Sequence, residues 1–261
     1  MKKFQSEFIQ AGEKIYTVQD LYEILERLQI GRGDVLCVHS QIFSFGRPLV
    51  SKENFLKIII SVLKKTVGEN GILIMPAFSY SFCRNEVFDV RNTPSTVGLL
   101  SEYFRKSDGV IRSLHPIFSF SVWGNRKEEY IDIGPDAFGL DSIYGKMLRD
   151  NGKILMFGAN KGYTFYHLAE EHVNVRHRYF KNFSGEMIDA EGNRKLVQVP
   201  YFVRDLSIKS DLDEKKLSFF LLENNLQNQV TFGKGTIGVL DCREVYKTLI
   251  ELLKVDERRF L

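Results

Sequence analysis

The stretch "GKILMFGANKGYTFYHLAEE", residues 152–171, decides the fold of this chain. It begins with a short apolar run typical of a buried strand, continues through glycine-containing turns and ends in an amphipathic segment. His167 lies where the strand gives way to a helix, among Tyr163, Phe165 and Tyr166. A core position would favour leucine, and a surface histidine would not need three aromatic neighbours. The stretch alone leaves open whether His167 packs, binds a metal or moves a proton.

Strand and helix patterns alternate along the first two thirds of the chain. We expect helices at residues 17–30, 51–67 and 93–109, and strands at residues 35–40, 72–82, 109–113, 117–124 and 152–159. Thr17 and Ser51 stand at the starts of the first two helices, where a side-chain oxygen can accept a backbone N–H. This alternation predicts a layered α/β domain.

The pattern changes after about residue 180. It is typical of a hairpin at residues 185–206, of helices at residues 213–225 and 242–255, and of a strand at residues 230–241. We expect these residues to form a smaller C-terminal α+β portion packed on the preceding one. No linker, repeat or low-complexity tract interrupts the chain, so residues 1–261 are predicted to form a single domain.

The composition excludes several classes of protein. Of the 261 residues, 44% are hydrophobic and 26% are charged, and the net charge is +3. This balance is typical of a globular protein and too mild for a nucleic-acid binder. The longest apolar runs are far shorter than a membrane span, so no membrane partner is expected. The N-terminal "MKKF" has no apolar segment behind it, which argues against a signal peptide.

The three cysteines, Cys37, Cys83 and Cys242, are an odd number without CxxC spacing. We therefore expect a reduced, cytoplasmic protein without a disulfide framework or a cysteine zinc site. Cys83 has no neighbouring base in the sequence and is predicted to be a small buried hydrophobe. Ser40 follows His39, but no G-x-S-x-G turn surrounds it, so a nucleophilic serine is not expected.

The other histidines and the glycine-rich segments suggest no metal or phosphate loop. His172 and His177 lie five residues apart without an HExxH pattern. Because Arg176, Arg178 and Lys181 would repel a cation, both histidines are predicted to lie on a solvated basic edge. "GRGD" and "GKGTIG" match neither a P-loop nor a dinucleotide motif and are predicted to be turns.

Two strands end in polar loops. They are followed by "VHSQIFSFGRP" at residues 38–48 and "RSLHPIFSF" at residues 112–120. Loops at the carboxyl ends of strands are where α/β sheets bind ligands. Backbone N–H groups and serine hydroxyls in such loops could bind phosphates or an amide-rich chain.

Several segments follow one another in an order that is specific to one family. They are "VHSQIFSFG" at 38–46, "LIMPAF" at 73–78, "RSLHPIFSF" at 112–120, "GKILMFGA" at 152–159 and "TFYHLAEE" at 164–171. Together they resemble the motifs of the aminoglycoside 3-N-acetyltransferase family, whose histidine motif is SLHLAE. The resemblance runs from about residue 17 to residue 182 and returns weakly at 233–253.

This resemblance implies a three-layer α/β/α fold with a central sheet. It also implies that acetyl-coenzyme A is the donor and that an amine of an amino sugar is the acceptor. Residues up to about 180 would form the coenzyme A-binding core, and residues 181–261 would complete the acceptor site. The alternative is a non-catalytic member that binds coenzyme A or a sugar, against which the retained His167 argues. The sequence leaves monomer and homodimer open.

The resemblance makes His167 the general base that takes a proton from the attacking amine. Asp205 is the predicted carboxylate partner, and a surface ion pair with Arg204 or Lys209 is the alternative for this residue. Glu170 follows His167 by three residues and shares its helix face. It would orient the base or bind the acceptor amine, unless it is an ordinary solvated glutamate.

The resemblance also implies a coenzyme A site in the loops at the strand ends. Its predicted residues are His39, Ser40, Ser44, Phe45, Gly46, Pro76, Phe78, Ser113, His115, Pro116 and Ser119. Gln41 and Ala77 stand where the family has serine and threonine, so two hydroxyl groups are absent. His115 is the second candidate for the base, but the proline after it favours an extended backbone, and we expect a structural role.

Acceptor binding is assigned to Tyr80, Glu170, Arg176 and Arg178. A site for polycationic antibiotics should be rich in carboxylates, whereas this chain lacks the family's downstream acidic run and carries Arg176, Arg178 and Lys181. We therefore expect the acceptor to be a nucleotide-linked amino sugar of surface polysaccharide synthesis. The alternative is an aminoglycoside antibiotic acetylated at its 3-amino group, which is a resistance activity.

Overall fold

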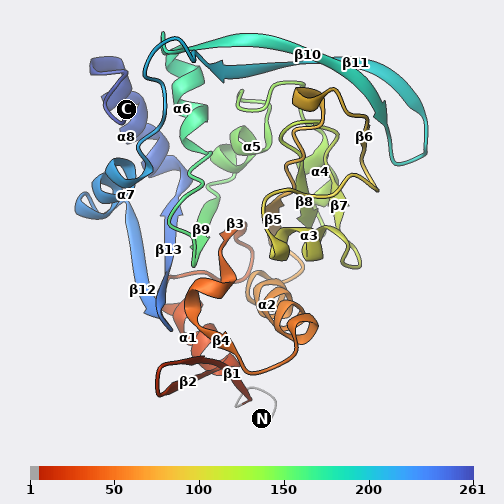
Figure 1. The fold of residues 1–261 in the computed structure, drawn as a ribbon. Helices are drawn as coiled ribbons and strands as arrows, with labels where there is room; N and C mark the ends of the chain where they lie inside the picture. The colour runs from red at the N-terminus through yellow and green to blue at the C-terminus, as the bar shows by residue number, and fades with distance from the viewer. Residues whose placement is uncertain (1–5) are drawn as a thin grey trace.

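Seven strands within residues 6–261, which a computed structural model describes, form one mixed sheet in the order β12–β13–β9–β3–β5–β8–β7 (Figure 1). Their bounds are β3 Val35–Ser40, β5 Ile72–Pro76, β7 Ile111–Arg112, β8 Phe120–Trp123, β9 Lys153–Phe157, β12 Gln227–Phe232 and β13 Gly235–Asp241. β3 pairs in parallel with β5 and β9, and the other pairs are antiparallel. The segment "MKKF", on which the signal-peptide prediction rests, lies outside the described residues.

Alternate residues of the strands face two separate apolar cores. In β3, Leu36 and Val38 face one core, and Val35 and Cys37 face the other. The first core includes residues of α1 (Val18–Arg27), α2 (Lys52–Val67) and α3 (Leu99–Arg105). The second includes residues of α4 (Lys127–Ile131), α5 (Ile143–Arg149), α6 (Tyr166–Val173), α7 (Glu214–Glu223) and α8 (Cys242–Val255). The sheet therefore lies between two helical layers, which confirms the predicted α/β/α class.

The predicted N-caps of α1 and α2 are both present. Thr17 Oγ1 accepts a hydrogen bond from Asp20 N at 3.2 Å, and Asp20 Oδ2 accepts one from Thr17 N at 2.6 Å. Ser51 Oγ accepts a hydrogen bond from Asn54 N at 3.3 Å. Reciprocal bonds of the first kind satisfy two N–H groups that the helix itself leaves without acceptors.

The C-terminal third contains two hairpins. The one predicted at residues 185–206 is confirmed and begins earlier, with β10 (Arg178–Ile188) paired to β11 (Arg194–Arg204). It extends over the top of the molecule in Figure 1 and pairs with β6 (Phe88–Asp89) outside the central sheet. The single strand predicted at residues 230–241 is instead the hairpin β12–β13. Because β13 pairs with β9, the C-terminal residues extend the central sheet.

Other details also differ from the sequence-based predictions. Cys83 is exposed, because it lies in a 3-10 turn (Phe82–Arg84) in which Phe82 takes the buried position. Cys37 and Cys242 are buried, and all three thiols are free. A small three-stranded sheet on either side of β3 in the sequence was not predicted. It consists of β1 (Glu7–Ala11), β2 (Lys14–Thr17) and β4 (Arg47–Pro48).

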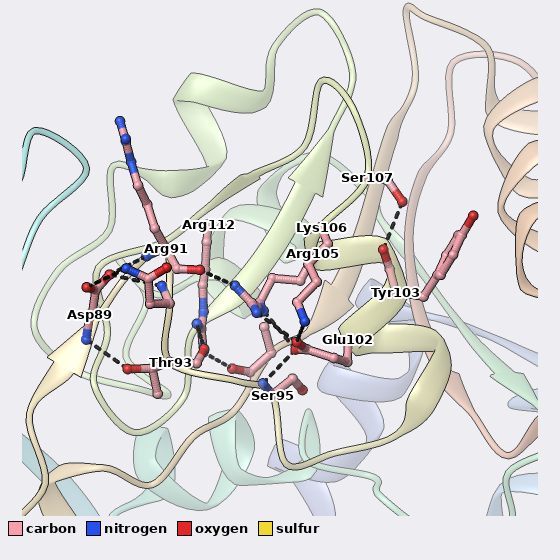
Figure 2. Close-up of polar contacts among 12 residues, drawn as sticks. Asp89, Arg91, Thr93, Ser95, Glu102, Tyr103, Arg105, Lys106, Ser107 and Arg112 are labelled. Atoms are coloured by element: carbon pink, nitrogen blue, oxygen red, sulfur yellow. Dashed lines mark hydrogen bonds and ion pairs between the residues drawn. The ribbon is translucent and has the colours of Figure 1, made fainter. Parts of the chain in front are cut away.

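A buried cation, Arg112, holds the loop of residues 89–98 to the end of β5 (Figure 2). Its Nη2 donates to Ala77 O at 2.6 Å, its Nε donates to Ser119 Oγ at 3.0 Å, and its Nη1 donates to Thr93 O. Ser95 N in the same loop donates to the side chain of Glu102 at 2.8 Å. Since the polar groups of this loop bond to other segments, α3 begins at Leu99 and not at residue 93 as predicted.

We expect Arg112→Leu to lower the free energy of unfolding by about 3 kcal/mol or more, because each buried acceptor left unpaired costs about 1–3 kcal/mol. Urea denaturation monitored by circular dichroism measures this loss. The control is Arg91→Leu, which changes an exposed arginine of the same loop and should leave stability nearly unchanged. Equal, small effects of the two substitutions would contradict the role of Arg112.

Candidate active site

The three aromatic residues around His167 anchor the loop that leads into α6. Tyr163, Phe165 and Tyr166 are 6%, 3% and 1% exposed. Tyr163 Oη lies 3.1 Å from both Ser218 Oγ and Gln227 Oε1. His167 is different, because its side chain is 15% exposed. The aromatic residues therefore pack, and they leave His167 at the edge of the core, within reach of a ligand.

A buried carboxylate holds His167. Glu170 is fully buried, and its Oε2 lies 2.6 Å from His167 Nδ1. Its Oε1 lies 2.8 Å from His177 Nε2. Arg178 Nε forms an ion pair with Oε2 at 2.7 Å. One carboxylate thus connects the first turn of α6 to the start of β10.

The charges in this cluster keep Glu170 ionised and His167 neutral. Burial raises the pKa of Glu170, but the hydrogen bond and charge of His167, with His177 and Arg178, outweigh it and hold the pKa at about 2. Burial, followed by the positive charge of Arg178, lowers the pKa of His167 despite the hydrogen bond to Glu170. A neutral imidazole beside an ionised carboxylate is the arrangement that a general base requires.

Aromatic side chains lie beside His167. The ring of Phe138 lies 5.0 Å from the imidazole, centroid to centroid, and the ring of Phe118 lies 4.9 Å from Phe138. Phe118 also contacts Tyr80 and, from β11, Tyr201 at 5.3 and 5.0 Å. Tyr80, a predicted acceptor-binding residue, therefore belongs to the aromatic wall that reaches His167.

The carboxylate partner of His167 is Glu170 and not Asp205. Asp205 Oδ1 accepts hydrogen bonds from the Ser207 N–H at 2.9 Å and from its hydroxyl at 2.6 Å. That local turn occupies the carboxylate and keeps it at the surface. The prediction of Asp205 as the partner was wrong because it depended on position in a strand, whereas the helical spacing of His167 and Glu170 places the two side chains together.

Two basic residues assigned to the acceptor are paired within the protein. Arg178 is 6% exposed and bound to Glu170, so it does not face the acceptor as predicted. Arg176 is exposed, and its Nε lies 2.7 Å from Glu257 Oε1. His177 is 2% exposed, which corrects its assignment to a solvated edge, whereas His172 is exposed and bonds to Tyr246.

Several residues assigned to coenzyme A have their side chains in the interior. Ser113 Oγ accepts from Phe120 N at 2.9 Å, and His115 Nδ1 accepts from Phe118 N at 2.9 Å. Ser119 Oγ donates to the Ala77 carbonyl. Phe45, Pro76, Phe78 and Pro116 are buried as well. These side chains support the loops from inside, so any contact of these residues with coenzyme A would come from their backbone, and their assignment to coenzyme A stays a prediction.

The loop after β3 contains a 3-10 turn (Ile42–Phe45) and has one half-buried polar side chain at its start, Ser40. Ser44 Oγ donates to Gly158 O at 2.9 Å, so this hydroxyl is used within the protein. Gly46 has φ 138°, and a Cβ there would lie 2.4 Å from Gln10 O, so packing against β1 requires glycine. His39 is 8% exposed, and burial lowers its pKa to about 4.

The loop after β3 lies near the start of α3. A Cβ built on Gly98 there would meet one atom within 4 Å, the Ser40 carbonyl oxygen at 3.8 Å. The assignment of Ser40 to coenzyme A stays a prediction. Within residues 6–261, no group of three or more histidine, cysteine or acidic side chains is arranged to hold a metal ion. No helix in the described part of the chain has the length and apolar character needed to cross a membrane.

Comparison with known proteins identifies the family. The profile of the aminoglycoside 3-N-acetyltransferases matches residues 37–254. The chain therefore belongs to the aminoglycoside 3-N-acetyltransferase family, which confirms the resemblance seen in the motifs. It is an acetyl-coenzyme A-dependent N-acetyltransferase of that family, and acetyl-coenzyme A is its co-substrate.

Relatives match over most of the chain. The chain is 27% identical over 252 residues to the SPbeta prophage-derived aminoglycoside N(3')-acetyltransferase-like protein YokD of Bacillus subtilis (strain 168), covering 87% of this chain and 86% of that protein. It is 29% identical over 245 residues to aminoglycoside N(3)-acetyltransferase IV of Salmonella sp, covering 91% and 87%. The solved structure of AAC-IIIb in a binary complex with CoASH has a TM-score of 0.77 at 23% identity, covering 93% and 96%.

The buried histidines predict how stability depends on pH. Burial lowers the pKa of both His39 and His115 to about 4, and it lowers the pKa of His167 in the same direction. The unfolded chain therefore binds more protons between pH 6.5 and pH 4, so stability falls as pH falls through this window. Each of the first two histidines should contribute about 1.4 kcal/mol per pH unit. Urea titrations at pH 7 and pH 5 measure this loss of unfolding free energy, which should be smaller in His115→Asn than in the parent protein. Equal stability of the parent protein at the two pH values would contradict the prediction.

Proposed function

We propose that the chain transfers the acetyl group of acetyl-coenzyme A to an amine of an aminoglycoside, with His167 as general base and Glu170 as the carboxylate that orients it. One observation carries the proposal. His167 Nδ1 lies 2.6 Å from Glu170 Oε2, which is buried, while the imidazole itself is partly exposed. A non-catalytic family member would have no need for a base held in this way.

The geometry assigns the tautomer of the base. Ionised Glu170 can only accept a hydrogen bond, so His167 donates through Nδ1–H and its Nε2 keeps a lone pair. This nitrogen takes the proton of the acceptor amine as the amine attacks. Glu170 stabilises the resulting imidazolium without being protonated. Acetyl-coenzyme A, when bound, would supply the thioester carbonyl under attack; the amide C–N bond forms, the C–S bond breaks, and coenzyme A leaves as the thiol with the proton that His167 took up. No serine or cysteine nucleophile is needed.

Three observations favour an aminoglycoside over the predicted nucleotide-linked amino sugar, for which the comparisons give no support. The relatives described above are named for aminoglycosides. Arg178 and Arg176, two of the cations on which the nucleotide prediction depended, are neutralised by Glu170 and Glu257. Asp136 and Glu171 form a carboxyl pair near the base, with Glu171 on the same helix as His167.

Asp136 and Glu171 form this pair beside the aromatic wall. A Cβ built on Gly139 would lie 2.9 Å from Asp136 Oδ2 and 3.3 Å from Glu171 Oε1. Burial, followed by the hydrogen bond with Asp136, raises the pKa of Glu171 to about 9. Glu171 belongs to the helix of His167, and Asp136 to the loop of Phe138. Such a pair would bind the ammonium groups of an aminoglycoside more readily than a phosphate.

We expect His167→Ala to lower kcat by about 10²–10⁴-fold, the usual contribution of a positioned base, with little change in KM for acetyl-coenzyme A. In the parent enzyme, kcat/KM should rise with pH through an ionisation below the ordinary histidine pKa and then level off, because the pKa of His167 is lowered. Raising the pH should partly restore the kcat of the variant, since more of the acceptor amine is then unprotonated. Thiol-release kinetics measure these parameters.

The control for this variant is His172→Ala, which changes an exposed histidine of the same helix. It should retain the parental kcat. If His167→Ala instead melted at a lower temperature with an unchanged kcat per folded molecule, His167 would be a packing residue and the proposed mechanism would be excluded.

The acceptor is tested with a panel of amines in the same thiol-release assay. We expect aminoglycosides that have a free 3-amino group to be acetylated with a higher kcat/KM than nucleotide-linked amino sugars. Mass spectrometry of the product would locate the added acetyl group. Efficient acetylation of nucleotide-linked amino sugars alone would refute the aminoglycoside proposal and leave the role of His167 intact.

A further inference from the structure

We propose that His177 is a positioning residue for acetyl transfer, which holds one oxygen of Glu170 so that the other faces His167. The proposal rests on the proposed role of His167 as the base. His177 is buried, and its Nε2 lies 2.8 Å from Glu170 Oε1. Because the ring of His177 is buried and bonds to Glu170, it would act through this carboxylate and not on the substrate.

The turn after α6 brings His177 to the carboxylate. Asn174 ends the helix in the left-handed conformation, with φ 57°, and Val175 N donates to Glu170 O at 3.1 Å. The chain thereby reverses and runs back over the helix. The carbonyl of His177 accepts a hydrogen bond from Asp205 N at 3.0 Å, which fixes the residue to the base of the hairpin β10–β11. His177 is thus held by backbone contacts that do not involve its ring.

The two oxygens of Glu170 have different partners. Oε2 lies close to His167 Nδ1 and Arg178 Nε, at 2.6 and 2.7 Å. The Arg178 Nε contact is an ion pair without hydrogen-bond geometry, and Arg178 Nη1 donates to Phe202 O. Among residues 6–261, the side-chain hydrogen bond to Oε1 comes from His177. Arg178 therefore stabilises the charge of Glu170, whereas His177 fixes the orientation of its carboxylate. The reason is that the energy of a hydrogen bond depends strongly on angle, whereas the energy of an ion pair depends on angle much less.

The surroundings of His177 assign its protonation. Its Nε2 must carry a proton to donate to ionised Glu170, and its Nδ1 is buried without a hydrogen-bond partner in the described residues. The other ionisable groups whose charges act on this cluster are Arg178 on β10, Arg204 and Tyr201 on β11, Tyr166 on α6, and Asp256 and Glu257 after α8. His177 thus orients the carboxylate through its Nε2–H group.

The test compares His177→Phe, which keeps a ring and removes the donor, with His177→Gln, which keeps an N–H donor. We expect the Phe variant to lower kcat by about 10–100-fold, the value of a hydrogen bond to a charged group, with little change in KM for acetyl-coenzyme A. Its kcat/KM profile should shift to lower pH, because a misplaced Glu170 no longer stabilises the imidazolium. The Gln variant should recover most of both losses. His172→Phe is the matched control and should behave like the parent enzyme.

A double variant separates this inference from the proposed function. If His177 acts through the base, His177→Phe should have almost no further effect on kcat in a His167→Ala background. A parental kcat in His167→Ala alone would refute the base and not merely His177. A collapsed kcat in His167→Ala, together with a parental kcat and pH profile in both His177 variants, would refute only the positioning role. If the Phe variant does not fold, His177→Asn, whose shorter amide does not reach Oε1, takes its place.

Discussion

The candidate site depends on one buried charge, the carboxylate of Glu170. A charge removed from water must be paired and hydrogen-bonded, and the partners here come from three places in the chain. They are His167 in the first turn of α6, His177 after the turn that ends this helix, and Arg178 at the start of β10. The same contacts therefore place the imidazole, the helix and the long hairpin relative to one another.

The central sheet brings the loops of the site to one edge. Because β3 pairs in parallel with both β5 and β9, the loops that follow these three strands leave the sheet on the same side. Arg112 holds two of the neighbouring segments through the carbonyl groups of Ala77 and Thr93. The side chains of Ser113 and Ser119, which the sequence assigned to a ligand, form hydrogen bonds within these loops. This explains why many polar residues near the site are buried and not exposed.

The charged groups around His167 act mainly on its imidazole and not on an acceptor. Burial lowers the pKa of the imidazole most, Arg178 and Arg204 lower it further, and Glu170 raises it. The balance leaves a ring that is neutral before the reaction and stabilised once it takes a proton. Cations that a sequence would assign to an anionic acceptor thus have a role inside the protein. The carboxyl pair of Asp136 and Glu171 is then a feature of this region that an amine-rich acceptor could use.

The sequence by itself determined the features that depend on near neighbours in the chain. These are the alternation of strands and helices, the N-caps at Thr17 and Ser51, the hairpin after residue 180, and the ordered motifs that identify the family and single out His167. Only the tertiary structure decided that Glu170 and not Asp205 pairs with His167, and that His177 is buried while Cys83 is exposed. The reason is physical. Capping and periodicity are set by residues within a few positions, whereas the burial of a polar side chain depends on which distant segment packs over it.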